Sequence, residues 1–180
     1  VLVVSGCLSQ RYKEDLCKAM PEAQIIIGVN EYEKLPQLLR DYRKGKQLSY
    51  FDDWMKEYSE TGVRMPLTAA YTSYLKIAEG CNNICAYCII PQIRGGYRSR
   101  KIDNILAEAR LLADKGCREL VIIAQDVTAY GIDIYGEFRL PHLLEKLCEI
   151  DGLRWIRLMY CYEDRITADL IKVMSENPKI

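Results

Sequence analysis

Three of the chain's eight cysteines, Cys81, Cys85 and Cys88, lie within the stretch EGCNNICAYCIIP. Thiolates are soft ligands that suit zinc, copper(I) or an iron–sulfur cluster. A closed zinc site usually takes four ligands in two separated pairs, and the only histidine here, His142, falls on a different predicted helix. A four-iron cluster held by three cysteines leaves one iron open to a substrate or cofactor. A zinc loop and inert structural thiols are the alternatives.

The residues around the triplet predict how it is positioned. A strand is expected over 71–78 and ends just before the cysteines, and a helix follows over 102–113, with Gly116 as its left-handed C-cap. Further strands are expected over 119–124 and 155–160, and helices over 140–150 and 167–175. Three strand–helix units of this kind predict a parallel sheet, either open or part of a barrel. The cysteines then lie where such sheets locate their chemistry.

The first part of the chain also alternates, with strands expected over 1–5 and 25–28 and helices over 10–20 and 32–42. Residues 44–70 lose periodicity and indicate a connector, so we expect a domain boundary near residue 66. The fold class is therefore α/β. The expected domains are residues 1–66 and 67–180.

Composition narrows the function classes. The 25 basic and 25 acidic side chains cancel, which provides no general field for a polyanion, and 49% of residues are hydrophobic. No run of 18 apolar residues occurs, so we expect a soluble protein with reduced cytosolic thiols. LVVSGC imitates a lipoprotein cleavage box, but too few apolar residues precede Cys7. Instead, a sequence that opens on VLVV and stops at NPKI is expected to be truncated at both ends.

The triplet with an aromatic residue, Tyr87, before its last cysteine resembles the signature of the radical S-adenosylmethionine superfamily. The longer stretch YLKIAEGCNNICAYCIIPQIRGGYRSR looks like the methylthiotransferase branch. This resemblance implies two 4Fe-4S clusters and S-adenosylmethionine as cofactors. Cys81, Cys85 and Cys88 would hold the radical cluster within a partial (βα) barrel. Cys7, in SGCLSQRY, matches the third ligand of the first cluster, held by an N-terminal methylthiotransferase domain whose end the chain would contain.

AQDVTAYGIDIYG, residues 124–136, is most similar to the sub-branch that modifies an aspartate of ribosomal protein S-twelve in the small subunit. Glu163 departs from that sub-branch, which usually has Pro there. The implied reaction uses one S-adenosylmethionine as methyl donor to a sulfur species at the first cluster. A second one yields the radical that removes hydrogen from the aspartate β-carbon. A tRNA adenosine methylthiotransferase is one alternative, and a non-catalytic metal-binding module that docks on ribosomes is another.

The resemblance also implies a flavodoxin- or ferredoxin-like electron donor, a cytoplasmic location and RNA contact through a C-terminal TRAM domain that this chain does not show. Arg94, Arg98 and Arg100 could bind a carboxylate of S-adenosylmethionine or substrate, or could be structural. Gln125 and Asp126 follow a predicted strand, where the superfamily contacts the methionine amino group, but could instead close a loop. Tyr130 is expected to pack beneath that loop, although it could instead line the ligand-binding mouth at the end of the strand. Cys17, Cys117, Cys148 and Cys161 match no ligand and are interpreted as small core residues.

Overall fold

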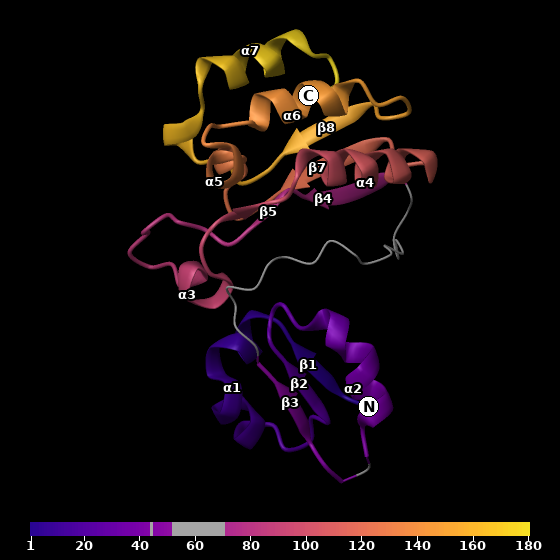
Figure 1. Ribbon diagram of the computed structural model, residues 1–180, viewed down its shortest axis with the longest axis vertical. Helices are drawn as coiled ribbons and strands as arrows, with labels where there is room; N and C mark the ends of the chain where they lie inside the picture. Colours follow the sequence, from indigo (N-terminus) through magenta and orange to yellow (C-terminus); the bar gives the residue numbers. More distant parts are fainter. Residues whose placement is uncertain (44, 52–70) are drawn as a thin grey trace. The chain divides into compact units, whose positions relative to one another are not determined.

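A computed structural model describes residues 1–43, 45–51 and 71–180 of the chain (Figure 1). The described residues divide into two compact units. The first takes in those of residues 1–58 together with 82–96, and the second those of residues 59–81 together with 97–180. The boundary expected near residue 66, and most of the expected connector, lie outside the described residues.

The first unit contains a parallel sheet of β1 (Val3–Ser5), β2 (Ile25–Ile27) and β3 (Leu48–Tyr50), in the order β1-β2-β3. The three isoleucines of β2 are 0% exposed, as expected of a central strand made of β-branched residues. The strand β3 was not expected, because it falls in the presumed connector. Its three residues, LSY, are too few to show a period.

Helix α1 (Cys7–Ala19) connects β1 to β2, and the short η1 (Tyr32–Lys34) leads into α2 (Leu35–Asp41). The helices expected over 10–20 and 32–42 are therefore confirmed, although α1 begins three residues earlier. Its backbone is interrupted at Lys13, where φ is 37° and ψ is −113°. Leu16 packs with Ala23 and Ile26 in a small core of this unit.

Two polar side chains tie the first turn of α1 to β2. The Ser9 hydroxyl donates to the carbonyl of Ile27 at 2.5 Å, and Gln10 Oε1 accepts from the backbone N–H of Val29 at 3.2 Å. A Cβ at Gly28 would lie 2.0 Å from Gln10 Oε1, so only glycine allows this approach. These contacts fix the start of α1, and with it Cys7, against the end of β2.

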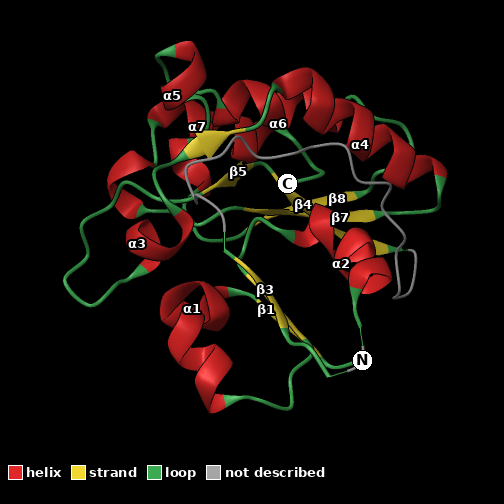
Figure 2. Cartoon of the chain, turned by 60° about the horizontal axis from the view of Figure 1, so that its bottom comes forward, coloured by secondary structure: helices red, strands yellow, loops and turns green. Residues whose placement is uncertain are grey.

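The second unit contains the parallel sheet that the sequence predicts. Strands β4 (Thr72–Lys76), β7 (Glu119–Ile123) and β8 (Trp155–Leu158) pair in the order β4-β7-β8. Helices α4 (Ile102–Asp114) and α6 (Leu140–Cys148) connect them, and α7 (Ala168–Glu176) follows β8. Figure 2 shows α4 and α6 side by side over one face of this sheet. Parallel strands require crossover connections, which these two helices provide.

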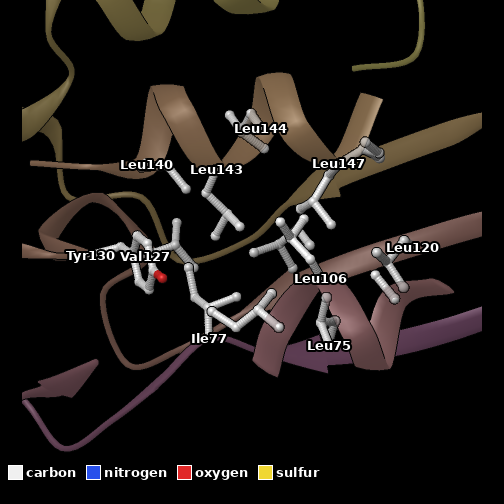
Figure 3. Packing of buried hydrophobic residues seen from close by; sticks show 14 of the residues in the cluster. Leu75, Ile77, Leu106, Leu120, Val127, Tyr130, Leu140, Leu143, Leu144 and Leu147 are labelled. Carbon is white, nitrogen blue, oxygen red and sulfur yellow. The ribbon is translucent and has the colours of Figure 1, made fainter. Parts of the chain in front are cut away.

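One apolar core joins these helices to the sheet (Figure 3). The side chains of Leu140, Leu143, Leu144 and Leu147 project from α6 toward those of α4 and the strands, at helical spacing. Gly116, with φ of 99°, ends α4 in a Schellman arrangement in which Cys117 N donates to Leu112 O at 3.0 Å. The expected C-cap is confirmed.

The segment that carries the cysteines is bracketed by a small antiparallel ladder in the second unit. Strand β5 (Ala78–Glu79) pairs with β6 (Arg98–Ser99). Helix α3 (Ile90–Arg94) lies within the segment, in the first unit. Two-residue strands and a five-residue helix have no measurable periodicity, so sequence reasoning missed all three.

The remaining short elements follow the last two strands of the second unit: η2 (Val127–Ala129) and α5 (Ile132–Tyr135) come after β7, and η3 (Glu163–Arg165) comes after β8. Within the described ranges, no helix is long and apolar enough to cross a membrane.

Candidate functional site

The cysteine loop, residues 81–88, follows directly after β5, as the sequence predicts for the triplet. The three thiols are not joined in disulfides; Cys81 is buried, and Cys85 and Cys88 are half-buried. The N–H of Cys88 donates to the carbonyl of Cys85 at 3.0 Å, which closes a four-residue turn. Because such a turn holds its end residues close together, it places Cys85 and Cys88 as neighbours.

The division into units falls inside this triplet. Cys81 belongs to the second unit, whereas Cys85 and Cys88 belong to the first. Among the described residues, no group of three or more His, Cys, Asp or Glu side chains is arranged to hold a metal ion. The donor set nevertheless suits iron and sulfide: the loop offers three unoxidised thiols and no carboxylate or imidazole that would favour a harder metal.

Two apolar side chains of the cysteine loop are almost fully exposed. Ile84 is 99% and Tyr87 is 94% exposed. Tyr87 occupies the second central position of the turn, between Ala86 and Cys88, and its exposure shows that its ring points away from the protein interior. The loop therefore offers an aromatic surface next to its thiols, on which a planar ligand could stack.

Cys7 begins α1 in the first unit and is half-buried. Gly6 precedes it with φ of 111°, a conformation that side chains rarely adopt. Nη2 of Arg94, the last residue of α3, donates to the Sγ of Cys7 at 3.4 Å. Since α3 packs on α1, the two sequence stretches with predicted cluster ligands meet within this unit.

The β7 loop, residues 124–131, carries the two polar residues predicted at the end of the strand, and the structure separates their roles. Gln125 is exposed, whereas Asp126 is 2% exposed. Asp126 caps η2 by accepting from Thr128 N at 3.0 Å, and its Oδ2 pairs with Nη1 of Arg165 at 2.6 Å. The Asp126 carboxylate closes the loop through these contacts, which favours the structural interpretation of Asp126, whereas the side chain of Gln125 stays exposed.

The three arginines predicted as a basic group do not act as one. Arg100 is 6% exposed; it donates to Lys76 O at 2.6 Å and pairs with Glu108 at 2.7 Å, which is a structural role. Arg98 lies half-buried on β6 in the second unit. Arg94 lies in the first unit beside Cys7.

Two buried tyrosines hold the β7 loop in place through hydrogen bonds to backbone carbonyls. Tyr130 is 0% exposed and donates to the carbonyl of Arg100 at 2.9 Å, so the packing interpretation is correct and the residue does not line a mouth. Tyr97 donates to the carbonyl of Asp126 at 2.8 Å. Burial raises the pKa of Tyr97 far above its usual range, and the nearby carboxylate of Asp126 adds to the rise. Its phenol therefore stays neutral and can act as a donor.

Sequence reasoning missed Tyr97 and Arg165 as partners of Asp126. Arg165 comes 39 residues after Asp126, and Tyr97 comes 29 residues before it. Neither has a local signal that distinguishes it from the other tyrosines and arginines of the chain.

The four cysteines without a predicted ligand role differ from one another. Cys117 is 1% exposed within the core, and Cys148 and Cys17 pack against apolar clusters. Burial raises the pKa of the Cys148 thiol, which disfavours the thiolate that a metal needs. Cys161 is exposed, so its interpretation as a core residue was wrong. It directly follows Tyr160, a non-glycine residue with a positive φ of 64° just after β8.

The chain is similar to known proteins in its family match and in its overall sequence. Residues 75–178 match the model of the Radical SAM superfamily. The chain is 48% identical over 180 residues to ribosomal protein uS12 methylthiotransferase RimO of Clostridium tetani, covering 100% of this chain and 40% of the relative. It is 49% identical over 180 residues to the protein of the same name from Desulforamulus reducens, with 99% and 40% covered.

The chain thus spans about two fifths of the length of these curated relatives. A solved radical S-adenosylmethionine methyltransferase, TsrM from Kitasatospora setae, matches 58% of this chain and 20% of its own, with 16% identity and a TM-score of 0.46, a likeness too weak to support an inference. The superfamily model, by contrast, covers more than half of the chain, from β4 through α7, and takes in all three cysteines of the loop. This chain belongs to the radical SAM superfamily.

Proposed function

We propose that the protein to which this chain belongs methylthiolates the β-carbon of an aspartate in ribosomal protein uS12. The observation that carries the proposal is the 48% identity that extends over all 180 residues to a uS12 methylthiotransferase. That identity includes the part of the chain before residue 75, which the superfamily model does not reach. The likeness therefore extends to both units rather than to the radical domain alone.

The cysteine loop would hold a 4Fe-4S cluster through Cys81, Cys85 and Cys88, with one iron left for the amino and carboxylate groups of S-adenosylmethionine. When bound, that cluster would supply the electron that cleaves S-adenosylmethionine to a 5'-deoxyadenosyl radical. The turn closed by the hydrogen bond from Cys88 N–H to Cys85 O supports this assignment, because it would hold two of the three ligands close together. Cys81, two residues after β5 in the chain, would be the third ligand.

Three further side chains would bind S-adenosylmethionine or substrate. Tyr87 presents an exposed ring beside the thiols, and Gln125 presents an exposed amide at the end of β7. Arg98 on β6 would bind a carboxylate, since a guanidinium does so through two parallel hydrogen bonds. Asp126 would act indirectly, by holding the β7 loop through Thr128 and Arg165.

Cys7 would be one ligand of a second 4Fe-4S cluster, at which the methylthio group is assembled. In this proposal residues 1–66 form the end of the N-terminal methylthiotransferase domain with its connector, and residues 67–180 form the first half of the radical domain. The donor chemistry fits at Cys7 too, because its thiol forms no disulfide and a guanidinium contacts it. A cationic donor stabilises a thiolate ligand.

The partners follow from the same proposal. A flavodoxin- or ferredoxin-like protein would supply electrons, and a C-terminal TRAM domain would contact RNA. Ribosomal protein uS12 as substrate implies action in the cytoplasm.

The first test is formation of 5'-deoxyadenosine by the full-length protein, reconstituted anaerobically with iron and sulfide and given S-adenosylmethionine and a strong reductant. Cys88→Ala should abolish the product, because it removes a cluster ligand. Cys161→Ala, which replaces an exposed thiol outside the proposed ligand set, should retain it. A wild-type protein that assembles the cluster but forms no 5'-deoxyadenosine would contradict the radical mechanism and favour a docking module.

The second test separates the substrates. Full-length protein is incubated with uS12, with its aspartate-to-asparagine variants and with unmodified tRNA, and the products are analysed by mass spectrometry. A methylthio group on one uS12 aspartate, and none on tRNA, is the expected result. Modified adenosine in tRNA would replace the proposed substrate while leaving the reaction class intact.

A further inference from the structure

The contact between Arg94 and Cys7 joins two stretches that are 87 residues apart in sequence. Arg94 ends α3, six residues beyond the last cysteine of the loop, and Cys7 begins α1. Both lie in the first unit, where α3 packs on α1. The helix that follows one set of predicted ligands therefore delivers its last side chain to a ligand of the other set.

The geometry is that of a hydrogen bond to sulfur. Arg94 Nη2 lies 3.4 Å from Cys7 Sγ, and both side chains are half-buried. A guanidinium is permanently charged and has five N–H donors, so this donation persists at every working pH. Partial burial reduces screening by water, which makes a charge at this distance more effective than one on an open surface.

Hydrogen bonds to cysteine sulfurs are one of the means by which a protein sets the potential of an iron–sulfur cluster. A cationic donor stabilises the more negative, reduced state of a cluster more than its oxidised state, because the added electron places more negative charge on the thiolate sulfur. A donor of this kind therefore raises the reduction potential. For Arg94 the sequence left a carboxylate contact and a structural role open, and the structure adds a contact with the thiol of Cys7.

We infer that Arg94 is a positioning residue for the first cluster, which orients Cys7 and raises the reduction potential of the cluster that Cys7 helps to hold. This inference rests on the proposed function, since it requires Cys7 to be a cluster ligand. It adds a physical link between the two cluster-binding stretches: the chain that forms the cysteine loop also tunes the other cluster through α3.

The test uses the full-length protein in a background with Cys81, Cys85 and Cys88 all replaced by Ala, so that only the first cluster assembles. Iron and sulfide content and the electron paramagnetic resonance spectrum of the reduced cluster are measured, followed by a potentiometric titration. Arg94→Gln should lower the equilibrium constant for one-electron reduction about tenfold, a shift of about 59 mV to more negative potential. Arg94→Lys, which keeps the charge but loses the planar fork, should shift it less.

The matched control is Arg11→Gln, which removes the same charge from an exposed position on α1, four residues after Cys7. It should leave both spectrum and potential unchanged. The inference is overturned if Arg94→Gln and Arg94→Lys leave the potential where it was, or if Arg11→Gln shifts it equally.

The failure of the proposed function gives a different result. If the background protein without the three loop cysteines binds no cluster, although the parent protein binds one, the two-cluster proposal fails and the inference fails with it. A cluster that is present with an unchanged potential in both Arg94 variants overturns the inference alone.

Discussion

In the cysteine loop the side chains of Ile84 and Tyr87 are 99% and 94% exposed, whereas in the β7 loop those of Val127 and Tyr130 are 0% exposed. Both loops follow strands of the second unit, and the sequence predicts functional residues in both. In the cysteine loop these two side chains are exposed and available to contact a ligand. The β7 loop is anchored before any ligand arrives, by hydrogen bonds from Tyr97 and Tyr130 and an ion pair with Arg165.

Under the proposed function, this difference would correspond to two tasks. A loop that provides cluster ligands obtains much of its order from the metal, since binding free energy and folding free energy are shared at such sites. A loop that supports a binding edge must be rigid beforehand, because small displacements there weaken the alignment of reacting groups. Substitutions in the two loops should therefore have opposite profiles, with activity affected in one and stability in the other.

The largest contrast is expected between two cysteines. Cys85→Ala should abolish the loop cluster and 5'-deoxyadenosine formation, while the free energy of unfolding of the cluster-free protein changes by less than about 0.5 kcal/mol. Cys117→Ala removes a core side chain that is 1% exposed, so it should cost about 1 kcal/mol and leave activity in place. Iron content measures the loop cluster, product analysis measures 5'-deoxyadenosine formation, and urea unfolding measures the free energy of unfolding. Equal loss of activity in both variants would remove the distinction between ligand and core thiols.

Two tyrosines should give the second contrast. Tyr130→Ala should destabilise the second unit by about 3–5 kcal/mol, as truncation of a buried aromatic side chain does. Tyr87→Ala should leave stability within about 0.5 kcal/mol of wild type. It should raise the KM for S-adenosylmethionine about tenfold, the equivalent of one lost aromatic contact. Chemical unfolding and steady-state kinetics of 5'-deoxyadenosine formation test the two variants. A loss of stability in Tyr87→Ala would show that the Tyr87 ring contributes to the packing of the folded protein.

The features that sequence alone predicted are those with local signals. The run of isoleucines at 25–27 indicated a buried strand, the spacing of Ile105, Leu106 and Ala109 indicated a helix, and Gly116 marked its end; the structure confirms each. The triplet of cysteines was visible because its chemistry depends on spacing within a few residues. Tyr130 was correctly interpreted as packing because an aromatic side chain next to a buried strand usually does so.

The features that the sequence did not reveal depend on partners far along the chain. Asp126 could be read as a ligand contact or a loop closure, and only the position of Arg165, 39 residues later, decides between them. The same holds for Arg94, whose contact with Cys7 spans 87 residues. The strand β3 was missed for a different reason, because three residues are too few for a period and its pairing with β2 supplies the stabilisation.

The Asp126–Arg165 pair provides the third test. Asp126→Asn keeps an acceptor for Thr128 but removes the charge that pairs with Arg165. It should destabilise the protein by about 2 kcal/mol, below the range for fully buried pairs because Arg165 is partly solvated. The control, Asp151→Asn, changes an exposed carboxylate and should cost less than about 0.5 kcal/mol. If both variants lose stability equally, the ion pair does not anchor the loop.

The smallest effect, and the most specific, concerns the phenol of Tyr97. Its pKa is raised in the folded protein by burial and by nearby carboxylates, so the folded state holds this proton more tightly than the unfolded state. The stability that results is fully present below the unfolded-state pKa of about 10 and decreases as the pH rises above it, because only the unfolded chain then ionises. Tyr97→Phe should cost about 1 kcal/mol at neutral pH, through loss of the hydrogen bond to Asp126 O, and should show less alkaline destabilisation. The free energy of unfolding is measured with urea at about pH 8 and about pH 11, and the difference between wild type and Tyr97→Phe should be smaller at the higher pH. The control, Tyr71→Phe, changes an exposed ring and should match wild type at both pH values. If this difference is the same at both pH values, ionisation of Tyr97 is not linked to unfolding, and the neutral phenol does not stabilise the β7 loop.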